Sequence, residues 1–113
     1  YVSKDGQTAP WQLGIDKDEC VPELKKMTDT VHDAGGKTEI QLSHGGIESD
    51  PALTGCVPQG PSAMKNVRYE LAQEMTEEKI QQICRAFGHA ADRARAAGFD
   101  AGRADVAVGV VRA

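Results

Sequence analysis

Residues 39–46, with the sequence EIQLSHGG, carry the pattern that decides the fold of this chain. Apolar and polar side chains alternate here, so Ile40 and Leu42 fall on one face of an extended segment and Gln41 falls on the other. Two glycines then end the alternation. The pattern predicts a strand over residues 37–43, with one face toward a core and a polar face that presents Gln41.

A histidine follows this strand and begins a long segment without a regular period. We expect His44 to be structural and to hold the turn from strand to loop, because a lone histidine is more often a hydrogen-bonded scaffold group than a ligand. Glycine and proline recur through residues 44–74, which predicts a loop of about 31 residues. Loops of that length are uncommon in compact domains and are usually functional.

Apolar residues at helical spacing precede the strand. They predict a helix near residues 20–34. The helix should start between Asp18, the better N-cap by chemistry, and Val21, because Pro22 is tolerated only in a first turn.

A second helical pattern follows the long loop, over residues 76–97, with Thr76 as N-cap. A further strand is expected to begin at Phe99. The order of helix, strand, loop, helix and strand is the α/β pattern, with parallel strands joined by crossover helices. The apolar stripe of the second helix consists of Ile80, Ile83, Cys84, Phe87, Ala90, Ala91 and Ala94.

Composition and charge argue against several classes of partner. The chain has 113 residues, 40% of them hydrophobic, and a net charge of −4. Its Lys and Arg residues are dispersed, which argues against a nucleic acid or an anionic membrane surface as a partner. The apolar runs are too short for a membrane span, and no signal-peptide pattern opens the chain. The expected location is the cytoplasm. The first residue is Tyr1, so we expect the sequence to begin inside a longer reading frame.

The cysteines and histidines suggest no metal site. The chain has three cysteines, at positions 20, 56 and 84. An odd number at wide spacing fits neither a disulfide framework nor a C-x-x-C metal motif. We interpret them as free thiols. His32 and His89 fall on the predicted helices without partner spacing, and we expect them at the surface or in helix packing.

Three runs in the same order and at fitting spacing resemble the old yellow enzyme family, the FMN-dependent NAD(P)H:flavin oxidoreductases. They are QLGIDKDECVPELKKMTDTVHDAGGKTEIQLSHGG, GPSAM and EMTEEKIQQICRAFGHAADRARAAGFD, together covering about residues 12–100. The resemblance implies a (β/α)8 TIM barrel, which needs about 250 residues. The chain would be a fragment, residues 1–113, from the end of the second strand through the second helix to the start of the fourth strand.

The resemblance also implies a cofactor site. In the family, the glutamine of the Q-L-x-H element hydrogen-bonds the flavin ring, and Gln41 occupies that place. A carboxamide offers both a donor and an acceptor without adding charge. The alternative is that Gln41 is an inward-facing barrel residue satisfied by its neighbours. The resemblance implies FMN as the cofactor and NAD(P)H as the electron donor. It also implies a small-molecule substrate. No catalytic residue is assigned.

The chain departs from the family in two places. Ile47 stands where the family motif has an arginine. On the fourth strand the family carries two donors that bind a substrate oxygen, and Asp105 and Val108 hold those positions here. Neither replaces a neutral hydrogen-bond donor. Residues 101–113 therefore form a divergent tail, and a truncated or frame-shifted gene is one hypothesis for it.

Two functions remain open. The first is an FMN-dependent oxidoreductase that passes hydride from NAD(P)H through FMN to an activated alkene or similar acceptor. The second is a non-catalytic truncated α/β fragment or interaction module, because an incomplete barrel leaves open sheet edges and no closed cofactor pocket. Open edges also predict self-association.

Overall fold

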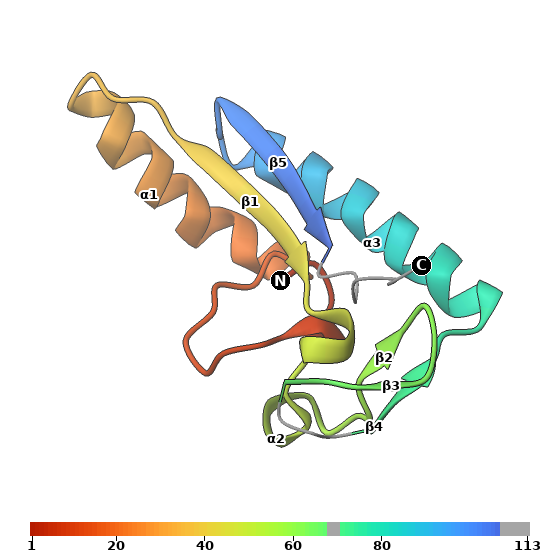
Figure 1. Cartoon of the computed structure of the whole chain (residues 1–113). Coiled ribbons are helices and arrows are strands. Elements are labelled where there is room, and N and C mark those ends of the chain that lie inside the picture. The colour runs from red at the N-terminus through yellow and green to blue at the C-terminus, as the bar shows by residue number, and fades with distance from the viewer. Residues whose placement is uncertain (68–70, 107–113) are drawn as a thin grey trace.

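The computed structural model describes residues 1–67 and 71–106 (Figure 1). The elements in chain order are η1 (Lys4–Gly6), η2 (Asp18–Cys20), α1 (Val21–Asp33), β1 (Glu39–His44), η3 (Gly46–Glu48), α2 (Pro51–Thr54), β2 (Gln59–Gly60), β3 (Met64–Lys65), β4 (Leu71–Glu74), α3 (Glu77–Ala96) and β5 (Ala101–Val106). The two long helices and the two long strands confirm the predicted α/β order, with boundaries shifted by one or two residues.

The main sheet pairs β1 with β5 in parallel, from Glu39 opposite Ala101 to His44 opposite Val106. On the other edge of β1, the amide of Val2 donates to the Ser43 carbonyl at 3.0 Å. The start of the chain thus lies along β1, as expected for the end of a preceding strand. Of the tail 101–113, residues 101–106 form β5. Val108 lies outside the described residues.

The helices α1 and α3 cover one face of this sheet (Figure 1). Leu42 is buried beneath them and Ile40 packs against the same core, whereas Gln41 is exposed on the opposite face. This confirms the predicted strand register. The Thr28 hydroxyl donates to the Ala97 carbonyl and joins the two helices in the interior. The core cluster consists of Val2, Ile15, Leu24, Leu42, Ala90, Ala94 and Ala97.

The two predicted helix caps have different outcomes. Thr76 accepts a hydrogen bond from the Lys79 amide at 3.2 Å and caps α3 as predicted. Helix α1 begins at Val21, within the predicted range, but Asp18, the better cap by chemistry, does not cap it. A 3-10 turn precedes the helix, and the Asp18 carboxylate instead accepts a hydrogen bond from Arg93 Nε at 2.7 Å. An ion pair with a neighbouring helix has replaced the local cap.

The apolar stripe of α3 is only partly buried. Ile83, Ala90 and Ala94 are buried, but Ile80, Cys84 and Ala91 are exposed. The predicted stripe is therefore present on the helix, but these three residues lie outside the core. Among the described elements, the long strands β1 and β5 contact α3 and leave this part of the stripe exposed.

The predicted structureless loop contains short elements. Beyond η3 and α2, the strands β2, β3 and β4 form a small sheet in the order β2–β4–β3 at the C-terminal end of β1 (Figure 1). β4 pairs in parallel with β2 and antiparallel to β3. The prediction missed them because strands of two to four residues are too short to show a period.

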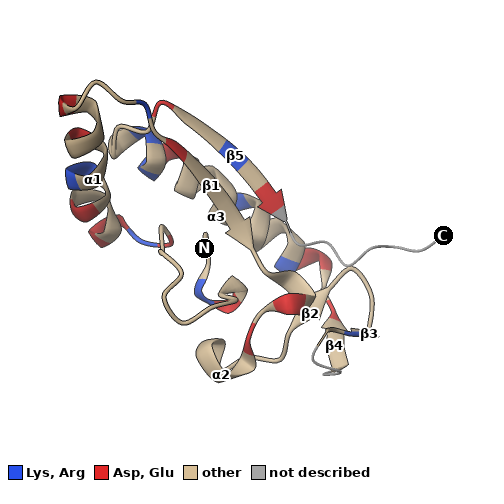
Figure 2. Ribbon diagram, turned by 60° about the vertical axis from the view of Figure 1, so that its left-hand side comes forward, with Lys and Arg blue, Asp and Glu red and all other residues tan. Residues whose placement is uncertain are grey.

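Charged residues of both signs are interspersed over the surface (Figure 2). Along β5 a basic position is followed by an acidic one at the end of the strand (Figure 2). Among the residues described, no helix has the length and apolar character needed to cross a membrane.

Candidate functional site

Gln41 lies on the sheet face opposite the helices, and its side chain connects the two strands. Its Nε2 donates to Asp105 Oδ2 at 2.6 Å, and its Oε1 accepts from Arg103 Nη2 at 3.1 Å. Arg103 is directly opposite Gln41 in the parallel register, and Asp105 is opposite Ser43. The two β5 side chains therefore hold the carboxamide with its oxygen toward Arg103 and its nitrogen toward Asp105.

A cavity of about 390 Å³ opens at the C-terminal end of these strands. The amide of Thr8 donates to Gln12 Oε1 at 2.9 Å, and Gln12 Nε2 donates to the Ser43 hydroxyl at 3.0 Å. The N-terminal segment thus supplies one wall of the cavity. The lining consists of Thr8, Gln12, Gln41, Ser43, His44, Gly45 and Asp105.

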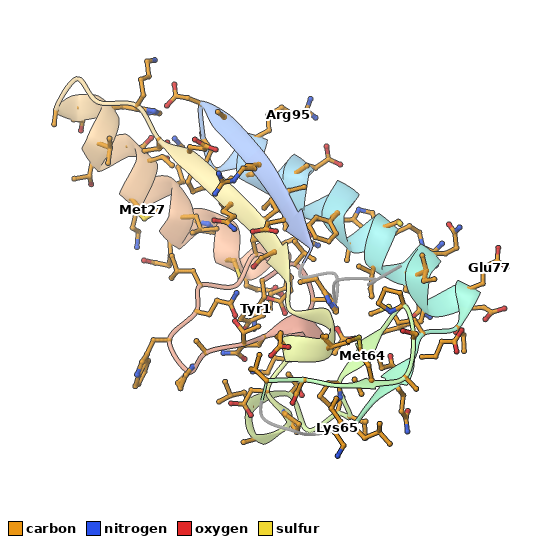
Figure 3. All side chains as sticks on the ribbon, in the orientation of Figure 1. Tyr1, Met27, Met64, Lys65, Glu77 and Arg95 are labelled. Atoms are coloured by element: carbon orange, nitrogen blue, oxygen red, sulfur yellow. The ribbon has the colours of Figure 1, made fainter. Side chains whose placement is uncertain are left out.

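A second cavity of about 300 Å³ lies between the N-terminal segment, β1 and α1, and its lining includes Leu24, Met27 and Ile40 from the helix-covered side. Gln12, Gln41 and Ser43 line both cavities. Tyr1 also lines the second cavity and lies beside the end of β1 (Figure 3). Gln41 therefore borders two cavities, one on the polar face and one that extends toward α1.

Sequence reasoning missed Gln12 and Thr8, because they fall in a segment without periodicity. Gln12 does open one of the runs that carry the family resemblance, which was an available signal.

His44 anchors the end of β1 from beneath this site. It is 3% exposed, and its Nδ1 accepts the Gly46 amide at 3.1 Å. A neutral ring that accepts at Nδ1 carries its proton on Nε2. That nitrogen lies 3.6 Å from Asp5 Oδ1, an electrostatic contact rather than a hydrogen bond. The structure thus agrees with the expectation that His44 holds the turn from strand to loop.

Asp5 links three parts of the chain. Its carboxylate contacts His44, pairs with Lys79 of α3 and accepts a hydrogen bond from Ser3. The contact with His44, followed by those with Lys79 and Ser3, holds the pKa of Asp5 well below its ordinary value despite partial burial. The adjacent Gly6 is required for close packing, since a Cβ there would lie 2.5 Å from the His44 ring.

The other two histidines take no part in the site. His32 Nε2 lies 2.7 Å from Asp100 Oδ2, beyond the opposite end of β1 from the cavity, and His89 is exposed on α3. Cys20, Cys56 and Cys84 are free thiols, as predicted.

Comparison with known sequences identifies the family. The sequence profile of the NADH:flavin oxidoreductase / NADH oxidase family matches residues 1–104. The chain belongs to this family. A probable NADH-dependent flavin oxidoreductase of Bacillus subtilis is 40% identical over 103 residues, which cover 88% of this chain and 27% of that protein. An NADH:acrylate oxidoreductase of Vibrio harveyi is 34% identical over 103 residues, covering 88% of this chain and 10% of that protein.

Solved structures agree with the family assignment. The old yellow enzyme homologue of Zymomonas mobilis has a TM-score of 0.84 and 29% identity, covering 91% of this chain and 32% of that one. Morphinone reductase in complex with tetrahydroNAD has a TM-score of 0.83 and 25% identity, covering 91% and 33%. The predicted fold class, a segment of a TIM barrel of the old yellow enzyme type, is confirmed. The described residues form no closed barrel, and the chain spans about a third or less of these relatives.

Among the described residues of this NADH:flavin oxidoreductase segment, Gln41 has hydrogen-bonding groups suited to the polar edge of a flavin ring. A carboxamide has two N–H groups and two oxygen lone pairs, and Asp105 and Arg103 each occupy one. One donor and one acceptor of Gln41 therefore stay available at the cavity for a ring edge that alternates donors and acceptors. Asp105 fits less well, because an ionised carboxylate only accepts hydrogen bonds.

Proposed function

We propose that this chain is a segment of an oxidoreductase that passes hydride from NAD(P)H through FMN to an activated alkene or a similar small-molecule acceptor. The observation that carries this proposal is the position of Gln41. It lies on the polar face of a strand within the matched family segment, and its exposed carboxamide lines both cavities. We assign to Gln41 the contact with the polar edge of the flavin ring.

The chain's own residues orient this contact. Arg103 donates to the Gln41 oxygen and Asp105 accepts from its nitrogen, so the amide is held in one orientation before any ligand arrives. Pre-organisation of this kind lowers the ordering cost of binding. FMN, when bound, supplies the hydride-carrying chemistry, and Gln41 positions its ring without adding charge.

Asp105 sets a limit on the acceptor. A carboxylate beside Gln41 cannot donate a hydrogen bond to a substrate oxygen, and it repels an oxygen that develops negative charge. The alternative function, a non-catalytic fragment or interaction module, is favoured by this residue. The roles of Gln41 and Asp105 therefore need to be tested separately.

A pair of chimeras makes that separation. In the first, residues 1–100 replace the matching segment of the Bacillus subtilis relative, which keeps its own fourth strand. In the second, residues 1–106 replace it and bring Asp105 with them. Retained FMN is measured from the visible absorption of the purified protein, and NAD(P)H oxidation is measured with an activated alkene as acceptor.

We expect the first chimera to bind FMN and to oxidise NAD(P)H, and a Gln41→Ala change in it to weaken FMN binding by about tenfold, the effect of one or two hydrogen bonds. The second chimera should retain FMN but lose turnover, and Asp105→His should restore turnover. A folded first chimera without FMN, or one indifferent to Gln41→Ala, would overturn the proposed role of Gln41. Equal turnover in both chimeras would overturn the role of Asp105.

We also propose a cytoplasmic location. The three free thiols suit a reducing compartment, where disulfides rarely persist.

A further inference from the structure

A third cavity shares no lining residue with the two cavities that border Gln41. It has a volume of about 370 Å³ and lies between the start of the chain and helix α3. Its charged lining residues are mostly basic, although the whole chain has a net charge of −4. We call this cavity the α3 groove. Its lining consists of Val2, Ser3, Lys4, Asp16, Gln82, Arg85, Ala86, His89 and Arg93.

Two ion pairs join the N-terminal segment to α3 on either side of the α3 groove. Asp5 pairs with Lys79 near the start of the helix, and Asp18 accepts a hydrogen bond from Arg93 Nε at 2.7 Å farther along it. Arg93 Nη1 also donates to the Ile15 carbonyl at 3.4 Å. Both walls of the groove therefore belong to described residues of this chain, and their own contacts hold them in place before any ligand binds.

The basic side chains of α3 differ in whether the chain supplies an opposite charge for them. Lys79, Arg93 and Arg95 each form an ion pair with an aspartate. Within residues 1–67 and 71–106, neither the Arg85 nor the His89 side chain has a hydrogen bond or an ion pair with the rest of the protein. These two side chains lie one helical turn apart and both line the groove. A guanidinium without a counter-charge in a pre-formed recess is suited to bind an oxyanion.

We propose that the α3 groove binds the phosphate group of a small molecule. Arg85 supplies a guanidinium fork from α3, and Lys4 supplies an ammonium from the opposite wall. Lys4 gives one hydrogen bond to Gln7, and Arg93 gives one each to Asp18 and Ile15. An ammonium has three donors and a guanidinium five, so both groups keep donors for a ligand.

The number of donors favours phosphate over carboxylate. A phosphate group has three terminal acceptor oxygens, which can bond to donors on two walls at once. A carboxylate has two acceptor oxygens in one plane, which a single guanidinium already satisfies. Three basic groups from two segments of the chain therefore match a tetrahedral oxyanion better than a planar one.

The volume of the groove and Asp16 restrict what can carry the phosphate. A cavity of about 370 Å³ falls within the size range of small-molecule sites and has room for more than a phosphate. The Asp16 carboxylate accepts hydrogen bonds and repels a second anionic group. A phosphate monoester with a neutral, hydroxyl-bearing remainder therefore fits better than a ligand with two acidic groups. This inference does not depend on the proposed redox function, because the groove has no residue in common with the Gln41 site.

Titration calorimetry of the 113-residue chain tests the site. The probes are glycerol phosphate, inorganic phosphate and acetate, at an ionic strength of about 0.15 M, where charges beyond about 8 Å are screened. We expect one glycerol phosphate per chain with a dissociation constant of about 1 mM or below, and acetate to bind at least about tenfold more weakly. Tighter binding of glycerol phosphate than of inorganic phosphate would identify an ester as the ligand, and equal affinity would identify free phosphate. Either result supports a phosphate site.

Two variants with the same change in charge locate the binding. Arg85→Gln removes the guanidinium that has no counter-charge and should weaken glycerol phosphate binding by about tenfold, the effect of one charge-assisted hydrogen bond. Arg95→Gln removes the same charge from the same helix. Because Arg95 lines a different cavity, beside β5, this change should alter the dissociation constant by less than about twofold. Both positions are exposed, and circular dichroism should show an unchanged helix content.

Four results would overturn the proposal. The first is a parent chain without saturable binding of either phosphate probe. The second is an Arg85→Gln variant that binds like the parent, and the third is an equal loss of affinity in Arg85→Gln and Arg95→Gln, which would show a general effect of charge. The fourth is acetate that binds as tightly as glycerol phosphate.

Discussion

Gln41 and Asp105, 64 residues apart in sequence, meet across the β1–β5 sheet with a hydrogen bond of 2.6 Å. This bond fixes the group assigned to the flavin and also places a carboxylate beside it. The same pair therefore supports a cofactor contact and opposes the polarisation of a substrate oxygen.

The 113-residue chain by itself should not accelerate NAD(P)H oxidation in the presence of FMN beyond the rate of free flavin. The physical reason is that the carboxamide of Gln41 supplies one or two hydrogen bonds, worth about 0.5–1.5 kcal/mol each, which cannot retain a cofactor. The measurement is the loss of NAD(P)H absorbance with and without the chain, with Gln41→Ala as control. A rate above free flavin that drops in the control would contradict the prediction.

The Gln41–Asp105 bond should contribute measurably to stability. Gln41→Ala and Asp105→Ala should each lower the unfolding free energy, and the double variant should lose less than their sum by about 0.5–1.5 kcal/mol. The cycle is measured by urea unfolding at several protein concentrations, so that any contribution of self-association is detected. Strict additivity of the two changes would show that the bond is not formed in solution.

Acid should destabilise the fold through Asp5. Its folded pKa is depressed by His44, Lys79 and Ser3, so its contribution is complete above the ordinary aspartate pKa of about 4 and is lost as pH falls below that value. Asp5→Asn should cost about 1–3 kcal/mol at neutral pH and should make the decline in stability below pH ~4 shallower. Thermal unfolding between neutral pH and about pH 3 measures this.

Asp100 provides a reference for that experiment. Its pKa is also lowered, chiefly by the Thr38 amide and then by His32 and Lys37, but it lies at the other end of the sheet. The Asp100→Asn variant should retain the part of the acid dependence that belongs to Asp5. Identical pH profiles for the parent and Asp5→Asn would rule out the proposed contribution.

Gly6→Ala should destabilise the chain by about 1–3 kcal/mol, because the added Cβ would lie 2.5 Å from the His44 ring and force one of them to move. Gly88→Ala is the matched control. Nothing lies within 4 Å of a Cβ at that position in the interior of α3, so it should stabilise by about 0.5–1 kcal/mol. Both are measured by urea unfolding, and equal effects would refute the close packing of Gly6 on His44.

The sequence predicted the long elements well because their patterns are local. Alternation around Gln41 was enough to give both the strand and its exposed face, and Thr76 marked the start of α3. Asp18 was misassigned because its partner, Arg93, lies 75 residues away. The exposed part of the α3 stripe, including Ile80, depends on how much sheet lies beneath the helix. No pattern within the helix contains that information.

The candidate site was predicted only in part for the same reason. The family resemblance predicted that Gln41 belongs to the site. Nothing in the sequence pattern predicted that Arg103 and Asp105 would both form hydrogen bonds with its side chain. Their contact follows from the parallel register of β1 and β5, which is a tertiary property. Gln12 was missed because it reaches Ser43 from an irregular segment, 31 positions away.

The parallel pairing of β1 with β5 also sets the order of folding. Gln41 and Arg103 are 62 positions apart, so the strands meet only after a long loop closes, whereas α1 and α3 depend on contacts within a few residues. Loop closure becomes costlier with length, by roughly 0.6 kcal/mol for each doubling. We therefore expect both helices to form within microseconds and the sheet to close in a slower, rate-limiting step.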